Sequence, residues 1–332
     1  MSGVTLKTVS EDENGMRLDR WFGLHYPQVK FGRLQKMIRT GQVRIDKGRA
    51  KTNARLSAGQ VVRVPPLEKQ SAHVVKPGRR NEADAQFITE RIIYEDDDVF
   101  VLNKPHGLAV QGGSGTTRHI DGMLKSLPNK KGEAPRLVHR LDRDTSGCLL
   151  VAKTRAAASH FGGVFRSRSA RKIYWALVVG VPSPNQGSIS CFLGKQSTRD
   201  GEQMAVVDKG VKGAQHSMSH YSVTDNAGRE FAWVTLKPVT GRTHQLRVHM
   251  MNLGTPILDD PRYYEMENWN WERPEGLGSG LHLHARRLAL PLRDGSGLDI
   301  TAPLPPHMKK SFDMLGFDAK RYDVQNIDPE ND

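Results

Sequence analysis

Asp142 is the residue of this sequence best placed to do chemistry. It lies in the run His139-Arg140-Leu141-Asp142-Arg143, which continues through Asp, Thr, Ser and Gly into an apolar stretch at 148–154. Small polar residues of these types form tight turns whose side chains bond to the backbone, so we expect Asp142 to be fixed where a strand begins. The neighbouring arginines favour the charged form of a carboxylate. Such a group suits a nucleophile or an anionic stabiliser better than a general acid.

Other interpretations of the same segment are weaker. An ordinary surface turn with Arg–Asp ion pairs has a similar composition. A protein kinase catalytic loop also contains His-Arg-Asp, but here Leu141 separates Arg140 from Asp142 and no Asp-Phe-Gly follows. Glycoside hydrolysis by Asp142 with Asp144 lacks a second acid in an apolar setting. The glycines of 112–115 match neither a P-loop nor a dinucleotide fingerprint, so we interpret them as a flexible loop beside a site.

Composition and charge indicate a nucleic-acid partner. The 332 residues carry a net charge of +13 and a pI near 9.8, and such a charge attracts polyanions. The length suggests about two domains, and no apolar run approaches the ~18 residues of a membrane span. The first residues have the pattern of neither a signal nor a transit peptide, so we expect a cytoplasmic protein that does not bind membranes. The two cysteines, Cys148 and Cys191, are too few for a disulfide framework, and we expect neither to be catalytic.

Residues 1–66 form a small basic module. They hold 13 Lys and Arg against 5 Asp and Glu, which places +8 of the net charge in the first fifth of the chain. The hydrophobic pattern predicts a helix around 18–22, a second helix over 33–39, and strands at 43–45 and 61–64. Two prolines at 65 and 66 end the module, because proline cannot continue a strand ladder.

The second helix of this module carries its basic residues on one face. Arg33, Lys36 and Arg39 recur at helical spacing and Arg44 follows in the next strand, so we expect all four to bind RNA. A membrane-surface helix has a similar pattern, but the apolar side of this helix is needed to pack the module. The order of helix, basic helix, glycine turn and two strands resembles the RNA-binding module of the ribosomal-protein S-four type. That resemblance implies binding to structured RNA.

A second domain is predicted over residues 91–317, after a polar linker at 67–90 and before a polar tail at 318–332. Its strand patterns lie at 99–102, 171–180, 231–237 and 286–292, and its helix patterns at 155–166 and 243–252. Many strands with few helices between them predict an α+β fold with a mixed, mainly antiparallel sheet.

The segment 241–249 carries a second set of polar residues. It follows a strand and predicts a helix start with Thr243 as the cap, which places Arg247 one turn into the helix and able to point into a cleft. His244 and His249 lack the spacing of a two-histidine zinc helix and have no further ligands nearby, so we predict no metal site.

Together these motifs resemble the RluA-type pseudouridine synthases, and among them the large-subunit ribosomal RNA enzymes of the RluC kind. The resemblance spans nearly the whole chain, and its motifs occur in one order: the basic module, Leu102-Asn103-Lys104-Pro105, residues 110–115, His139-Arg140-Leu141-Asp142 with Thr145-Ser146-Gly147, Lys172-Ile173-Tyr174, residues 241–249 and Leu283-His284-Ala285.

The resemblance implies a role for each matching residue. Asp142 corresponds to the catalytic aspartate, Tyr174 to the tyrosine that stacks on the target base, and Arg247 to the arginine paired with the aspartate. Arg140 corresponds to the arginine that helps to hold the place of the flipped nucleotide. The reaction isomerises uridine to pseudouridine without a cofactor, and its target base must leave the stack. Three routes for the aspartate stay open: attack on the ribose, attack on the ring, or assistance in removing a sugar proton.

Two further expectations concern the surroundings of the site. Basic residues near Tyr174 are expected to bind RNA: Arg166, Arg168, Arg171 and Lys172. Taken alone, Tyr174 would be interpreted as a half-buried strand tyrosine. Residues 263–277, including Asn268-Trp269-Asn270-Trp271, are longer and more aromatic than the family leads us to expect. We interpret them as an insertion that either contacts RNA or anchors to its own domain.

The leading prediction is a monomeric enzyme that isomerises specific uridines of large-subunit ribosomal RNA. Transfer RNA is an alternative substrate, because recognition of RNA loops depends on tertiary shape. A ribosome-assembly factor that binds RNA without turnover is an alternative of another class. The joint presence of Asp142, Tyr174 and Arg247 favours the enzyme, since binding a polyanion does not require a carboxylate.

Overall fold

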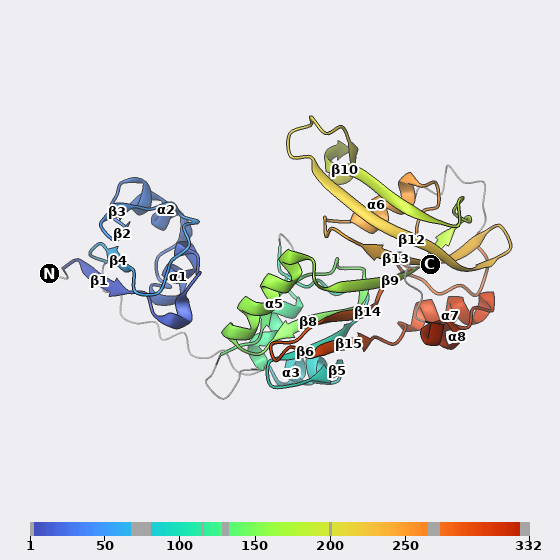
Figure 1. Cartoon of the computed structure of the whole chain (residues 1–332), viewed down its shortest axis with the longest axis horizontal. Helices are drawn as coiled ribbons and strands as arrows, with labels where there is room; N and C mark the ends of the chain where they lie inside the picture. Colours follow the sequence, from blue (N-terminus) through green and yellow to red (C-terminus); the bar gives the residue numbers. More distant parts are fainter. Residues whose placement is uncertain are drawn as a thin grey trace. The chain divides into compact units, whose positions relative to one another are not determined.

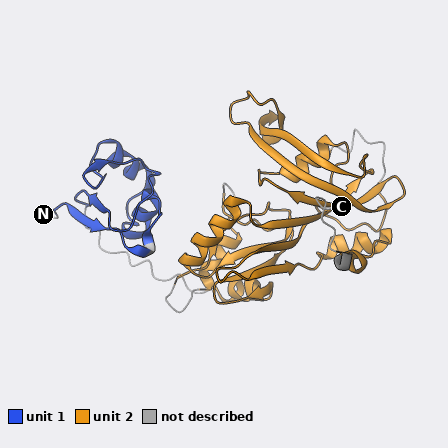
Figure 2. Ribbon diagram, viewed as in Figure 1, with its two compact units in different colours: residues 1–79 blue, residues 80–332 orange. Residues whose placement is uncertain are grey.

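The chain forms two compact units, residues 1–79 and 80–332, which Figure 2 colours separately. The computed structural model describes residues 3–67, 81–113, 116–127, 133–198, 201–264 and 273–325. Within these residues, no helix is both long and apolar enough to cross a membrane.

The first unit packs two helices against a four-stranded sheet with the strand order β1-β4-β2-β3 (Figure 1). Its elements are β1 (Thr5–Thr8), η1 (Glu11–Glu13), α1 (Leu18–His25), α2 (Phe31–Arg39), β2 (Arg44–Ile45), β3 (Gly48–Arg49) and β4 (Val61–Val64). Trp21 and Phe22 of α1 are buried in one core with Leu34 of α2 and Val62 of β4. The predicted order of helices and strands is therefore confirmed in this unit.

The second unit is built on one large sheet with the order β11-β10-β12-β13-β9-β14-β8-β6-β5, with β15 paired to β14 and β7 to β8. Strands β8 and β14 run parallel, and the other strand pairs of this sheet in the described residues run antiparallel. The predicted mixed, mainly antiparallel sheet is thus confirmed.

The strands of the second unit are β5 (Ile92–Glu95), β6 (Val99–Lys104), β7 (Arg136–Leu137), β8 (Ser146–Ala152), β9 (Arg171–Val179), β10 (Gln186–Thr198), β11 (Gly201–Val207), β12 (Gln215–Ala227), β13 (Phe231–Pro238), β14 (Leu283–Pro291) and β15 (Gly297–Thr301). Its helices are α3 (Glu82–Thr89), α4 (Ile120–Met123), η2 (Leu124–Ser126), α5 (Arg155–Ser167), α6 (Gln245–Asn252), α7 (Pro306–Leu315) and α8 (Ala319–Gln325).

Helices cover both faces of the sheet where β6 and β8 run. Successive side chains of a strand point to opposite faces, so Val101 packs with Phe161 of α5, whereas Leu102 packs with Ile88 of α3. Strand β8 is buried along its whole length. A strand covered on both faces has a nearly continuous apolar sequence, as this one does from Cys148 to Ala152. Cys148 of β8 packs there as a small buried side chain, and burial raises the pKa of its thiol to about 12.

The same arrangement recurs where β9 and β13 run. Trp175 and Trp233 pack on one face with Phe312 of α7, while Ala176 packs on the other face with Leu246 of α6. The sheet therefore holds α6 on the face from which the even-numbered side chains of β9 project.

The structure differs from the predicted domain boundaries in two places. The predicted linker 67–90 ends in helix α3, whose Ile88 is buried in the core of the second unit. The predicted tail 318–332 begins with helix α8, whose Tyr322 packs edge-on against Trp233 at 5.1 Å between ring centroids. Both helices are short and about half polar, and their few apolar contacts depend on the tertiary fold.

Candidate active site

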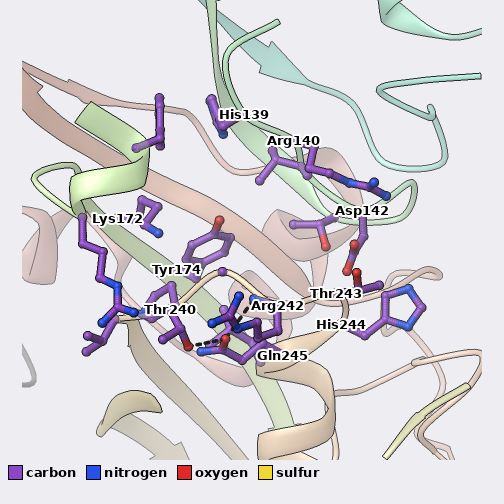
Figure 3. Close-up of a pocket in the computed structure, with 18 of the residues that line it drawn as sticks. His139, Arg140, Asp142, Lys172, Tyr174, Thr240, Arg242, Thr243, His244 and Gln245 are labelled. Atoms are coloured by element: carbon purple, nitrogen blue, oxygen red, sulfur yellow. Dashed lines mark hydrogen bonds between the residues drawn. The ribbon is translucent and has the colours of Figure 1, made fainter. Parts of the chain in front are cut away.

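A pocket of about 530 Å³ brings the predicted catalytic residues together (Figure 3). It is lined by the loop before β8, the end of α5, β9 and the loop from β13 to α6. Asp142, Tyr174 and Arg247 all line it, as does Arg140. The volume lies within the range of roughly 300–1,000 Å³ that is typical of small-molecule sites.

Charge in the pocket is distributed unevenly. Asp142 is the one acid among the described lining residues, whereas the basic residues there are Arg140, Arg166, Arg168, Lys172, Arg242 and Arg247. The Asp142 side chain is 19% exposed, and its Oδ2 lies 4.0 Å from Nη1 of Arg247. In Figure 3 its carboxylate points toward the loop that carries Thr243. A single, partly exposed carboxylate thus faces a strongly cationic cavity.

A buried lysine holds the loop that carries Asp142. Lys104, the last residue of β6, is 0% exposed. Its Nζ donates to three backbone carbonyl oxygens at 2.7–2.9 Å, those of Pro105, Leu108 and Arg143. Burial lowers the pKa of Lys104 to about 7, and the charges of Asp144 and Asp142 oppose that shift. The three acceptors favour the ammonium form, because a neutral amine has too few N–H groups to serve them all.

Strand β8 starts directly after this loop and is fixed there by β14. Gly147 has φ +107°, and a Cβ at this position would lie 2.3 Å from the Ala285 carbonyl oxygen, so only glycine fits. Ser146 Oγ lies 2.8 Å from Nδ1 of His284, whose Nε2 lies 3.2 Å from the Ala302 carbonyl oxygen. A carbonyl only accepts, so Nε2 carries the proton and Nδ1 accepts from Ser146. Burial lowers the pKa of His284 to about 3, which keeps it neutral.

His139 fixes the other end of the loop. Its ring stacks on Phe165 of α5 at 4.2 Å between centroids, and its Nε2 accepts the backbone N–H of Leu150 at 2.8 Å. Burial, followed by the charge of Lys172, lowers the pKa of His139 to about 3. His139 therefore positions the neighbouring residues and is not a proton donor at neutral pH.

Strand β9 supplies an aromatic ring and a cation from one face. Tyr174 and Lys172 both project into the pocket (Figure 3). Burial and then the charge of Asp142 raise the pKa of Tyr174, so its phenol stays protonated. Burial and then Arg168 lower the pKa of Lys172. Arg171 was predicted to act beside Lys172, but it does not line the pocket, because alternate residues of a strand face opposite sides.

The predicted cap of helix α6 is wrong. The helix begins at Gln245 after His244, which has a left-handed backbone with φ 53° and makes no side-chain cap bond. Thr243 is exposed and lines the pocket instead of capping the helix. The left-handed turn at His244 directs the chain into the helix, so Thr243 lies one residue before the cap position.

Gln245 holds the loop before α6 in place. Its Oε1 accepts from Thr240 Oγ1 at 2.6 Å and from the Arg242 backbone N–H at 3.0 Å. Its Nε2 donates to the Met218 carbonyl oxygen at 2.9 Å and to Ser219 Oγ at 2.8 Å, both on β12. The amide thus accepts two hydrogen bonds through its oxygen and donates two through its nitrogen, which ties this wall of the pocket to the sheet.

Arg247 has a stronger partner than the predicted one. Its Nε and Nη2 donate to the two carboxylate oxygens of Asp260 at 2.7 and 2.6 Å, whereas Asp142 is reached only at 4.0 Å through Nη1. Burial acts to lower the pKa of Arg247. The hydrogen bonds and charge of Asp260, and then the charge of Asp142, outweigh burial and raise the pKa overall. Sequence analysis missed Asp260, although the Asp-Asp-Pro-Arg-Tyr stretch at 259–263 offered a candidate.

Known proteins are similar to this sequence over nearly its full length. A model of the RNA pseudouridylate synthase family matches residues 98–252, which include Asp142, Tyr174 and Arg247. Ribosomal large subunit pseudouridine synthase C of Pasteurella multocida is 36% identical over 317 residues, which cover 94% of each chain. The chain belongs to the RNA pseudouridine synthases.

Two further comparisons agree with this membership. The mitochondrial RNA pseudouridine synthase 4 of Arabidopsis thaliana is 32% identical, and the alignment covers 94% of this synthase and 82% of the Arabidopsis chain. The solved structure of human RNA pseudouridylate synthase domain containing 4 is 32% identical, with a TM-score of 0.57 over 70% of this synthase and 95% of the human chain. The activity of an RNA pseudouridine synthase and the α+β fold predicted from the sequence are therefore confirmed.

The first unit of the synthase turns a basic helix face outward. Helix α2 buries Leu34 and Ile38, and its exposed side carries Arg33, Lys36 and Arg39. Arg44 is exposed too, but its guanidinium donates within its own turn, to the carbonyl oxygens of Gly41 and Lys47. The predicted common face is confirmed, and RNA binding by these four residues stays a prediction.

Two sequence features of the synthase fall largely outside the described residues. Residues 114–115 of the glycine loop and residues 265–272, which include both tryptophans of the proposed insertion, are not described. At the start of the insertion, Tyr263 is buried and its hydroxyl lies 2.8 Å from Nδ1 of His244. This part of the segment therefore packs behind His244 and Arg247, which line the pocket.

Proposed function

We propose that this synthase converts specific uridines of large-subunit ribosomal RNA to pseudouridine and that Asp142 is its catalytic residue. The observation that carries the proposal is the lone, partly exposed Asp142 carboxylate in a pocket whose other charged residues are cations. The basic residues suit a phosphate backbone. Binding of RNA does not require a carboxylate, so its presence in the pocket favours a chemical reaction there.

The chemistry needs an ionised carboxylate with accessible oxygens. Uridine and pseudouridine are isomers, so the bond from the ribose to the ring nitrogen breaks, the base turns, and a bond from the ribose to a ring carbon forms. That carbon loses its hydrogen as a proton, and the released nitrogen gains a proton. Asp142 can attack the ribose, attack the ring or assist removal of a sugar proton, and each route uses its free oxygens. No redox agent or group donor enters this balance, and the proposal includes no cofactor.

The other pocket residues then act on a flipped nucleotide. Tyr174 presents an aromatic ring on which the target base stacks, and Arg140 fills the place that the base leaves. Lys172, Arg166 and Arg168 bind neighbouring phosphates. In the first unit, Arg33, Lys36, Arg39 and Arg44 contact the RNA at a distance from the target, and Arg171 contacts RNA outside the pocket.

The choice of large-subunit RNA rests on the relatives. Several of them carry the name ribosomal large subunit pseudouridine synthase C at 35–36% identity over 92–95% of this chain. The first unit resembles a module that binds structured RNA, which suits a ribosomal substrate. A cytoplasmic, monomeric protein is part of the same proposal.

Mapping of pseudouridine in the total RNA of cells that lack this protein tests the proposal. We expect discrete sites of the large-subunit RNA to lose the modification, to regain it with the wild-type chain, and not to regain it with Asp142→Asn. Loss of transfer RNA sites alone would contradict the proposed substrate. Restoration by Asp142→Asn would contradict the proposed catalytic residue.

A further inference from the structure

Asp260 is a buried carboxylate in which both oxygens are occupied. Its side chain is 0% exposed. Oδ2 accepts from Arg247 Nε at 2.7 Å, and Oδ1 accepts from Arg247 Nη2 at 2.6 Å and from the backbone N–H groups of Arg262 and Tyr263 at 2.9 and 3.1 Å. A carboxylate with four donors and no exposed surface cannot itself reach a nucleotide.

The large sheet fixes the position of Asp260. The segment before it pairs with β9, where the Leu258 N–H donates to the Leu177 carbonyl oxygen and the Val179 N–H donates to the Pro256 carbonyl oxygen, both at 2.9 Å. The Leu258 carbonyl oxygen accepts the N–H of His282, directly before β14. Asp260 is thus tied to the strand that carries Tyr174 and is not part of a free loop.

Tyr263 completes the surroundings of the guanidinium. Its ring centroid lies 5.0 Å from Cζ of Arg247. The hydroxyl of Tyr263 accepts the Met204 N–H at 3.2 Å and lies 2.8 Å from Nδ1 of His244. The ring is held from two sides, so it limits the directions in which Arg247 can move.

The distance of 4.0 Å between Arg247 and Asp142 follows from this arrangement. An arginine beside a single carboxylate frequently forms a two-pronged pair with it at hydrogen-bond distance. Here Asp260 takes Nε and Nη2, so that only Nη1 faces Asp142. Asp142 keeps a nearby positive charge, while its oxygens stay free of a strong hydrogen bond from that arginine.

We infer that Asp260 is a positioning residue that holds Arg247 near Asp142 but prevents it from closing onto the reactive carboxylate. This inference rests on the proposed catalytic role of Asp142. Asp260 lies beyond the residues 98–252 that the family model matches. It acts only through Arg247, because its own oxygens are used and buried.

The matched pair of variants is Asp260→Asn and Asp259→Asn. Asp259 is the preceding residue, and its carboxylate pairs with Arg273 at 3.1 Å instead of Arg247. With a short RNA target, we expect Asp260→Asn to lower kcat about 100-fold and to change KM less than about threefold, because the guanidinium then closes onto Asp142. Asp259→Asn should keep kcat within about twofold of the wild type.

A double variant separates positioning from a general structural role. If Asp260 acts through Arg247, the variant with both Asp260→Asn and Arg247→Met has the kcat of Arg247→Met alone. A double variant about tenfold slower than Arg247→Met, or an Asp260→Asn with wild-type kcat, overturns the inference. If Asp260→Asn does not fold, Asp260→Glu is measured instead. It keeps the charge but shifts the guanidinium by a methylene, and an unchanged kcat contradicts the inference.

Asp142→Asn in the same assay separates the two proposals. Full turnover by Asp142→Asn shows that the proposed catalytic residue is wrong. Inactive Asp142→Asn together with fully active Asp260→Asn shows that only the positioning role is wrong.

Discussion

The two basic regions of this synthase hold their charges in opposite ways. On α2 of the first unit, Arg33, Lys36 and Arg39 are exposed on one helix face. In the pocket of the second unit, Arg247 is 3% exposed and bonded to a buried acid, so its guanidinium has one orientation. Exposed charges attract RNA from a distance and adapt to its shape, whereas buried charges keep one geometry. Under the proposed function, the first arrangement serves affinity for RNA and the second serves the reaction.

The largest effect is expected from Asp142→Asn. The amide keeps the shape of the side chain but removes its negative charge and reactivity, so turnover should fall about 10³-fold or more, while RNA affinity stays within about threefold. Tritium release from labelled uridine in RNA and filter binding measure the two quantities. A variant that loses affinity and turnover to the same degree would show that Asp142 also serves RNA binding. That result would contradict the proposed division of roles between the two basic regions.

A smaller loss of turnover is expected from Lys104→Met. The variant removes the ammonium that holds the Arg143 carbonyl oxygen at 2.8 Å, and a reactive group misplaced by ~1 Å can cost about 100-fold in rate. RNA affinity should change little, because Lys104 is buried. Lys153→Met is the matched control, since its Nζ also bonds a backbone carbonyl, that of Asp96. Equal losses in kcat for the two lysines would contradict the positioning role of Lys104.

A change in affinity without a change in kcat is expected from the triple variant Arg33→Gln, Lys36→Gln and Arg39→Gln. Each lost phosphate contact reduces the magnitude of the slope of log affinity against log salt by about 0.7–0.9, so the loss of three contacts should reduce it by about 2–3. The control replaces three arginines of the same unit that already have partners: Arg17, Arg55 and Arg63. Both triple variants remove the same charge. An equal fall of the slope in both would show that net charge, not the α2 face, binds RNA.

A further difference between the two units is expected in their stability to acid. His139 and His284 have pKa values lowered to about 3 by burial, so the folded second unit binds fewer protons than the unfolded chain below about pH 6.5. Each histidine then costs about 1.4 kcal/mol of stability per pH unit as the pH falls from 6.5 toward 3.

The first unit should resist acid for longer. Burial acts to raise the pKa of Glu13, but hydrogen bonds from Ser10, Trp21 and His25 lower it overall, so the stability that Glu13 contributes is lost only as the pH falls below 4.5. Amide hydrogen exchange at pH 7 and 5.5 should show weaker protection in the second unit at the lower pH and little change in the first. The reverse order would contradict the assignment of buried neutral histidines.

Residues whose place is set by the neighbouring sequence could be predicted. Contacts between residues far apart in the sequence could not. Strand β8 is apolar from Cys148 to Ala152, and the turn before it places Asp142 near its start, so both were recognisable. Tyr174 and Arg247 came from the family motifs. The contact of Arg247 with Asp260 depends on how α6 packs beside β9, which no spacing in the sequence encodes.

Lys104 and the short helices illustrate the same limit. Nothing in the Asn-Lys-Pro sequence shows that its lysine is buried, because the three carbonyl oxygens that surround the Lys104 ammonium come from two separate loops. Helices α3 and α8 are each held by a few apolar contacts that exist only in the folded unit. Strand alternation also places Arg171 outside the residues that line the pocket, so its predicted contact with RNA stays a prediction.

The place of β14 in the sheet has a consequence for the synthesis of the protein. This strand is made late, yet it lies between β9 and β8, and it carries Ala285 and His284 against the residues that follow the Asp142 loop. While the nascent chain ends before residue 283, β8 and β9 have no strand between them to join the two halves of the sheet. The Asp142 carboxylate is thus translated long before the strand that fixes it, so the proposed site can form only after residues 283–291 have left the ribosome.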